Sequence, residues 1–198
     1  MRKQKALIVV DIQNDFCPGG ALAVSDGDKI IPIVNDLLAK FNLVIFTKDW
    51  HPANHLSFAS AHEGKEPYDS YNGNVLWPDH CVENTPGAEL HPDLDLTKCQ
   101  KDFYIFKKGT DINSNGYSAF ENTELQEFLD ERGVTEVYIC GLATDYCVKN
   151  TAIDSALAGY DTYVLADACK SIDSDLTQTK QELFEAGAYF VDTWAIGL

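Results

Sequence analysis

The sequence predicts an α/β fold of three layers, in which helices cover both faces of a mainly parallel sheet of about six strands. Short apolar runs alternate with segments of helical periodicity, and this alternation is typical of right-handed βαβ units. The apolar runs are continuous, which indicates strands that are buried on both faces. A length of 198 residues suits one hydrophobic core.

Six short apolar runs are expected to form the strands. Because each is continuous, none shows the polar alternation of a strand with one face in water. In chain order they are 6–10 (ALIVV), 43–46 (LVIF), 103–106 (FYIF), 136–140 (EVYIC), 161–166 (DTYVLA) and 188–193 (AYFVDT).

Four segments between these runs are expected to form helices. The second has a capping-box pattern from Thr123 to Gln126 at its start. The second and the fourth both end at a glycine, the residue that most often terminates a helix. The four segments are 30–41, 123–133, 145–160 and 174–187.

Residues 1–198 are expected to form a single domain with a long insert at about residues 50–102. The insert breaks the strand–helix alternation and is rich in aromatic residues, proline, glycine, asparagine and histidine. Loops of this length in compact domains are usually lids or binding loops. The insert is therefore expected to bind a ligand.

The composition argues against several partners. The formal net charge is -16 and the pI about 4.5, so a nucleic acid or an anionic membrane would meet no basic surface. No apolar run approaches the roughly 20 residues of a membrane helix, and the first run is shorter than the core of a secretory signal. We expect a cytoplasmic protein. Its six scattered cysteines form no C-x-x-C pair and are expected to be free thiols.

Reactive side chains follow four of the predicted strands. In an open parallel sheet, ligands bind beyond the carboxyl ends of the strands, so these side chains are expected to meet at one edge. They are Asp11 after the first strand, Asp49 and His51 after the second, Lys107 and Lys108 after the third, and Cys147 after the fourth.

Cys147 is the candidate nucleophile. It follows Gly141 in the first turn of a predicted helix, where unpaired N–H groups and the helix dipole favour a thiolate and could also hold an oxyanion. A buried structural thiol is the alternative for Cys147, and it is the preferred interpretation for the other five cysteines.

Asp11 and one lysine could complete a catalytic group with this thiol. Asp11 could take the thiol proton and return it to a leaving group, although a salt bridge or a cap would also explain a carboxylate there. Strand alternation sends only one of Lys107 and Lys108 towards the site.

Asp49 and His51 could bind a metal, since an Asp-x-His pair projects both side chains from one side of an extended strand. Imidazole and carboxylate ligands suit zinc, iron or manganese. The third ligand could be His80, His62 or His91, while His55 could hydrogen-bond a metal-bound water. A capped turn is the alternative.

Five motifs resemble the nicotinamidase/pyrazinamidase branch of the isochorismatase-like cysteine hydrolases, and the likeness runs nearly end to end. The motifs are VVDIQNDFCPGGALAV (9–24), TKDWHPANHLSFAS (47–60), LWPDHCVENTPGAELHP (76–92), FKKGTD with YSAF (106–120) and GLATDYCVKNTA (141–152).

The resemblance implies a role for each matching position. It implies one divalent metal ion, zinc in the first place, with iron or manganese as alternatives, and an oxyanion site at a cis Leu142–Ala143 peptide. Trp50 is also expected to supply an apolar wall. The remaining implied residues are Cys147 as nucleophile, Asp11 as acid/base, Lys108 as third catalytic residue, Asp49, His51 and His80 as metal ligands, and Phe16, Trp77 and Tyr117 around the substrate ring.

The implied reaction is hydrolysis of nicotinamide to nicotinate and ammonia in NAD salvage, with pyrazinamide as a second substrate. In this family the pyridine nitrogen meets the metal. The alternatives are another small-amide cysteine hydrolase of the superfamily and a non-enzymatic zinc or thiol protein. The sequence leaves open whether the chain is a monomer or a homo-oligomer.

Overall fold

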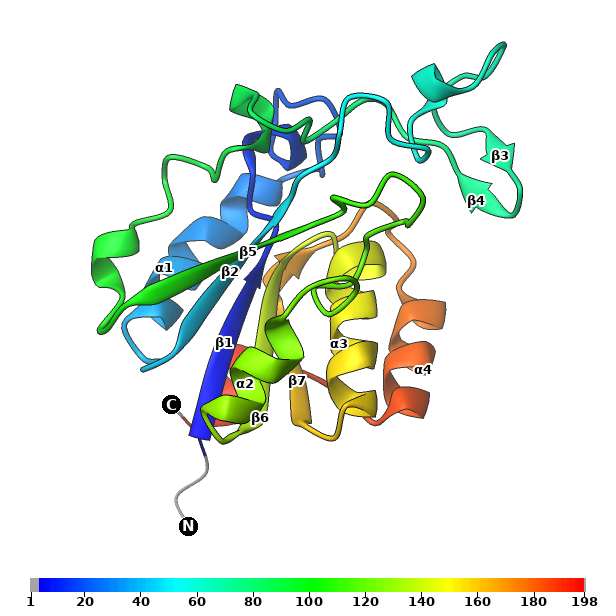
Figure 1. Ribbon diagram of the computed structural model, residues 1–198. Helices are drawn as coiled ribbons and strands as arrows, with labels where there is room; N and C mark the ends of the chain where they lie inside the picture. Colours follow the sequence, from blue (N-terminus) through cyan, green and yellow to red (C-terminus); the bar gives the residue numbers. More distant parts are fainter. Residues whose placement is uncertain (1–3, 198) are drawn as a thin grey trace.

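A computed structural model describes residues 4–197, and a six-stranded sheet forms its centre (Figure 1). The strand order is β5-β2-β1-β6-β7-β8, and every neighbouring pair is parallel. The predicted fold class is therefore confirmed. The strands are β1 (Gln4–Val10), β2 (Val44–Asp49), β5 (Phe103–Lys108), β6 (Val134–Leu142), β7 (Asp161–Lys170) and β8 (Tyr189–Val191).

Helices cover both faces of this sheet (Figure 1). The helix α1 (Ile31–Leu38) lies on one face, and α2 (Leu125–Glu131), α3 (Lys149–Leu157) and α4 (Thr177–Ala186) lie on the other. The residues of β1 from Ala6 to Val10 have no exposed surface, as expected for a strand covered on both sides. No helix within residues 4–197 has both the length and the apolar character needed to cross a membrane.

Two predicted helix starts differ in detail from the structure. The hydroxyl oxygen of Thr123 accepts the N–H of Leu125 at 3.2 Å, so it caps one residue earlier than the expected capping box. The segment predicted as a helix from residue 145 begins with a π-helical turn, Thr144–Val148, which leads directly into α3. This wider turn carries Cys147.

The insert contains little regular structure. It has short 3-10 turns and one antiparallel hairpin of β3 (Ser70–Tyr71) and β4 (Asn74–Val75). Single β-bridges join His51 to Val82 and Phe58 to Trp77. The insert thus lies over the carboxyl edge of the sheet (Figure 1) and brings its aromatic and histidine side chains next to β2.

Gly141 allows the close approach of β6 and β1. Its φ of 122° is one that side-chain-bearing residues rarely adopt. It pairs with Val10 across the two strands, and a Cβ at Gly141 would clash with the Val10 carbonyl. The backbone just before the turn that carries Cys147 therefore requires a glycine.

Replacing this glycine should be costly. Gly141→Ala is expected to lower the free energy of unfolding by about 3 kcal/mol or more, because backbone strain and overpacking add. Gly133→Ala is the matched control, since Gly133 also has positive φ but open space around its Cβ position, and about 1–2 kcal/mol is expected there. Urea unfolding followed by circular dichroism measures both. An equal loss of unfolding free energy in the two variants would contradict the predicted clash at Gly141.

Candidate active site

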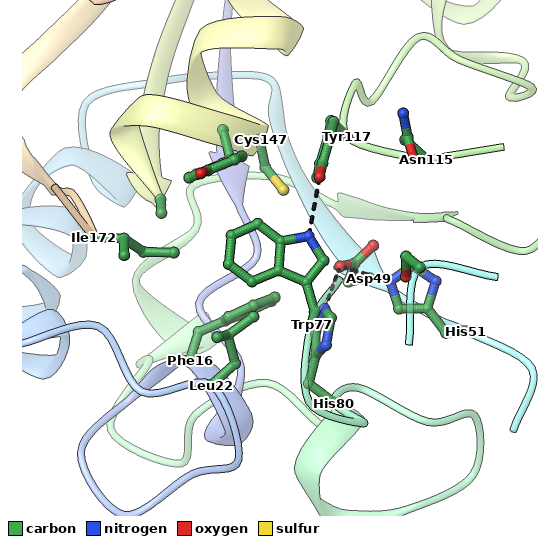
Figure 2. Close-up of a pocket in the computed structure, with 13 residues that line it drawn as sticks. Phe16, Leu22, Asp49, His51, Trp77, His80, Asn115, Tyr117, Cys147 and Ile172 are labelled. Carbon is green, nitrogen blue, oxygen red and sulfur yellow. Dashed lines mark hydrogen bonds and ion pairs between the residues drawn. The ribbon is translucent and has the colours of Figure 1, made fainter. Parts of the chain in front are cut away.

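A pocket at the carboxyl edge of the sheet brings together most of the side chains that the sequence singled out, whereas Asp11, Lys108 and Leu142 are not among its lining residues (Figure 2). It encloses about 370 Å³, counted out to its open mouth. Trp77 lies between the Asp49–His51–His80 group and the apolar side formed by Phe16, Leu22 and Ile172 (Figure 2). The full lining is Phe16, Leu22, Asp49, His51, Ser57, Trp77, His80, Asn115, Tyr117, Ala143, Tyr146, Cys147 and Ile172.

Lys108 is not among the lining residues, but its buried ammonium contacts two of them, Asp49 and Cys147, as well as Asp11. Its Nζ lies 2.8 Å from Asp11 Oδ2, 2.9 Å from Asp49 Oδ1 and 3.3 Å from Cys147 Sγ. Lys107 points to the opposite face of β5, with its Nζ 3.8 Å from the centre of the Trp50 ring. Strand alternation therefore selects Lys108.

The charges in this group hold one another in place. Burial acts to lower the pKa of Lys108, but Asp11 and Asp49 raise it well above its usual value, so the ammonium keeps its proton. Burial raises the pKa of Asp11, and Lys108 opposes that rise. Among the described residues, Asp11 Oδ2 accepts no hydrogen bond of ordinary geometry despite its short ion pair with Lys108.

The surroundings of Cys147 oppose the thiolate that a helix start favours. Burial raises the pKa of Cys147 well above its usual value, and the nearby Asp11 and Asp49 carboxylates raise it further, against the lowering effect of Lys108. The helix start alone favours a thiolate, whereas burial and two carboxylates beside the sulfur act against it. The Cys147 thiol is therefore expected to need a base in order to react.

Asp49, His51 and His80 form a compact three-ligand cluster in which the possible ligand atoms all lie within 4.8 Å of one another. His51 Nε2 is 3.0 Å and His80 Nε2 is 3.6 Å from Asp49 Oδ2. In each ring, Nδ1 lies within 2.8 Å of a carbonyl oxygen, that of Gly109 or Pro78. Nδ1 therefore carries the hydrogen and donates it.

This arrangement fits a metal ion. Metal-binding histidines usually donate their second nitrogen to a carbonyl, which fixes the tautomer and directs the other lone pair at the metal. Burial acts to raise the pKa of Asp49, but His51 and Lys108 hold it well below its usual range, so Asp49 is a carboxylate. Two imidazoles and one carboxylate are a donor set suited to zinc and similar ions.

The other histidines lie outside the cluster. His55 Nε2 is 3.1 Å from the Asp111 carbonyl, and its Nδ1 is 2.7 Å from Ser57 Oγ, so both nitrogens already have protein partners. Burial lowers the pKa of His55 to about 4, which keeps the ring neutral. His62 contacts the Leu56 carbonyl and His91 lies beside Asp93, so of the three possible third ligands only His80 joins Asp49 and His51.

Aromatic rings line the rest of the pocket. Trp77 Nε1–H donates to the Tyr117 hydroxyl at 2.9 Å, and the Trp77 ring contacts that of Tyr146 edge to face at 4.9 Å. The Phe16 ring lies 5.4 Å from that of His80. Phe16, Trp77 and Tyr117 therefore all line this pocket.

Trp50 does not wall the pocket, so that expectation is wrong. Its side chain points to the other face of β2, where the Nζ atoms of Lys48 and Lys107 lie 4.3 and 3.8 Å from the centre of its ring. The Leu142–Ala143 peptide is cis, as the resemblance implied. Five lining residues were missed. Leu22, Ser57 and Tyr146 stood within the recognised motifs and could have been found, whereas Asn115 and Ile172 lie in loops that gave no signal.

An α/β sheet with a buried cysteine, aspartate and lysine beside a metal-binding cluster is a hydrolase-like arrangement, and the comparisons agree with it. The chain belongs to the isochorismatase family, because the model of the isochorismatase domain matches residues 5–194.

Several relatives are close in sequence and structure. The chain is 50% identical to the nicotinamidase of Acinetobacter baylyi, over 92% of this chain and 89% of the relative. It is 41% identical to that of Escherichia coli, over 96% of each. It is similar in structure to a nicotinamidase/pyrazinamidase of Acinetobacter baumanii, with a TM-score of 0.90, 43% identity and 97% of each chain covered. The pyrazinamidase of Pyrococcus horikoshii in complex with zinc gives a TM-score of 0.82 and 43% identity, over 96% of this chain and 99% of that one.

The ligand cluster predicts the effect of removing one histidine. The protein should bind about one divalent ion per chain, and His80→Ala should weaken binding at least about 100-fold, because one of three protein ligands is lost. His91→Ala is the control and should leave the affinity unchanged. Elemental analysis and competition with a coloured chelator measure both. Equal effects of the two substitutions would contradict the assignment of His80.

Proposed function

We propose that this protein is a nicotinamidase, which hydrolyses nicotinamide to nicotinate and ammonia and accepts pyrazinamide as well. The observation that carries the proposal is the contact of one buried lysine with Asp11, Asp49 and Cys147 beside an aromatic pocket and a metal-binding cluster. The curated nicotinamidases that the chain resembles support it. Such a reaction belongs to NAD salvage.

The first half of the reaction forms a thioester. Asp11 takes the proton of Cys147 as the sulfur attacks the carboxamide carbon, and the developing oxyanion is stabilised by the backbone N–H groups of Ala143 and Cys147. When the tetrahedral intermediate collapses, Asp11 returns the proton to the leaving nitrogen, and ammonia departs. Lys108 keeps the aspartate charge balanced throughout.

The second half regenerates the thiol. Asp11 takes a proton from a water molecule, which attacks the thioester carbon, and the C–S bond breaks. The proton passes back to sulfur, so Cys147 is again a thiol. The product keeps the second proton of the water as nicotinic acid and loses it to solvent to give nicotinate. The same carboxylate thus serves as base and acid in each half, which suits a pKa raised by burial and lowered by Lys108.

Asp49, His51 and His80 would hold the metal, for which zinc is the expected ion. When bound, it supplies a Lewis-acid site for the ring nitrogen of the substrate. Phe16 and Trp77 exclude water from the ring faces, and Tyr117 fixes Trp77 through their hydrogen bond. The ring is thereby held with its carboxamide over the sulfur.

Two other functions are less well supported. A carbamoyl amidohydrolase is suggested only by a likeness of fold, since the N-carbamoylsarcosine amidase of Thermoplasma acidophilum is 22% identical with a TM-score of 0.74. A zinc or thiol protein without activity would have no need of a buried lysine between acid and thiol. The six free cysteines support a cytoplasmic setting.

The catalytic assignment predicts a pattern of losses. Cys147→Ala should abolish ammonia release from nicotinamide in a folded protein, and Asp11→Asn and Lys108→Ala should each lower kcat by about 10²–10⁴-fold. The losses should not add, because the three residues act as a unit. Lys107→Ala, on the opposite strand face, should have little effect. An essential Lys107 and a dispensable Lys108 would show that the wrong lysine was chosen.

The metal cluster predicts how the ring is recognised. Benzamide matches nicotinamide in shape but offers no ring nitrogen, and sites built for a polar group can reject analogues lacking it by ~10⁴–10⁵-fold. Its kcat/KM should therefore be at least about a thousandfold lower, while pyrazinamide should be a good substrate. His51→Ala should reduce the difference in kcat/KM between nicotinamide and benzamide, mainly by lowering the kcat/KM for nicotinamide. Comparable turnover of both amides by the metal-loaded enzyme would rule out this mode of recognition.

A further inference from the structure

Thr47 lies beside the proposed base, in the part of β2 that precedes the metal ligand Asp49. Its side chain has no exposed surface. Its hydroxyl oxygen accepts the backbone N–H of Asp11 at 3.2 Å and lies 2.6 Å from Asp11 Oδ1. Because a hydroxyl has one hydrogen and Oδ1 of the carboxylate can only accept, that hydrogen is donated to Oδ1.

These two bonds fix both the backbone and the side chain of one residue. Asp11 has a φ of 48°, in the left-handed region that non-glycine residues adopt only when their surroundings impose it. One hydroxyl spans the N–H and the carboxylate of Asp11, so the carboxylate has a fixed orientation relative to the strand end.

The two carboxylate oxygens are therefore not equivalent. Oδ1 is occupied by Thr47. Oδ2 lies 2.8 Å from Lys108 Nζ and accepts no hydrogen bond of ordinary geometry among the described residues. Asp11 also places a carboxylate oxygen within 4.8 Å of Cys147 Sγ, on the side where Lys108 contacts the sulfur.

We infer that Thr47 is a positioning residue that makes Asp11 Oδ2 the oxygen that exchanges a proton with Cys147. The inference rests on the proposed function, since it assigns a partner to the proposed base. With Thr47 in place, Oδ2 receives the thiol proton and Oδ1 keeps its hydrogen bond whether Asp11 is charged or neutral. Without the hydroxyl, the carboxylate can rotate away from the sulfur.

The test compares Thr47→Val, which keeps the shape of the side chain but lacks the hydroxyl, with Thr47→Ser, which keeps the hydroxyl. The valine variant should lose kcat on nicotinamide by about 10- to 100-fold, because a hydrogen bond to a charged group is removed from the base. Its KM and metal content should stay within about twofold of wild type, and serine should restore most of kcat.

Thr162→Val is the matched control. Thr162 is equally buried and its hydroxyl lies 2.8 Å from that of Ser155, but it belongs to the start of β7, at the edge of the sheet away from the site. This variant should lower the melting temperature and leave kcat unchanged. If Thr47→Val does not fold, Thr47→Ala and Thr47→Ser form a second pair, and alanine should be the slower of the two.

Two results would overturn the inference. One is a kcat of Thr47→Val within about twofold of wild type, and the other is an equal loss in the valine and serine variants. Failure of the proposed function is recognised separately, as absence of ammonia release by the wild type. In that case, the rate of Cys147 alkylation by iodoacetamide at fixed pH replaces kcat, and it should fall in Thr47→Val and recover in Thr47→Ser.

Discussion

The burial of one ammonium group between two carboxylates is the interaction on which the site depends. A lysine with no exposed side-chain surface is tolerated only when it is paired, and Lys108 meets Asp11 and Asp49 at 2.8 and 2.9 Å. These partners follow or end β1 and β2, while Lys108 ends β5. Three strand ends must therefore be in register before the charge is satisfied, so assembly of the sheet and assembly of the site are the same event.

Asp49 connects the two halves of this site through its separate oxygens. Oδ1 contacts Lys108, whereas Oδ2 faces His51 and His80. The group that would do the covalent chemistry and the group that would hold the metal are thus joined by one carboxylate. Gly109 also joins the two groups. It follows Lys108 in the chain, and its carbonyl oxygen accepts a hydrogen bond from His51. A side chain at this position would clash with the His51 ring.

The sheet could be predicted from the sequence because continuous apolar runs are a local signal. The edge that carries the reactive side chains could be predicted because these residues directly follow the predicted strands. The choice of Lys108 over Lys107 needed the family resemblance. Strand alternation shows that only one of the two lysines faces the site, but it does not show which one. The rise in the pKa of Cys147 could not be predicted, because it depends on burial and on carboxylates that come from two other strands. The position of Trp50 could have been predicted, because the alternation that points Asp49 and His51 into the site sends Trp50 to the opposite face, next to Lys48 and Lys107.

The alternation along β2 has a consequence for how such a chain can diverge. Thr47, Asp49 and His51 serve the site, while Lys48 and Trp50 pack on the opposite face. A deletion or insertion of one residue within this stretch would turn the site residues to the opposite face of the strand and bring the other set into the site. Such a change of length is therefore expected to abolish function in one step. Point substitutions can accumulate on the Trp50 face. Changes of length, by contrast, can be accommodated in the insert, because they leave the alternation along β2 undisturbed.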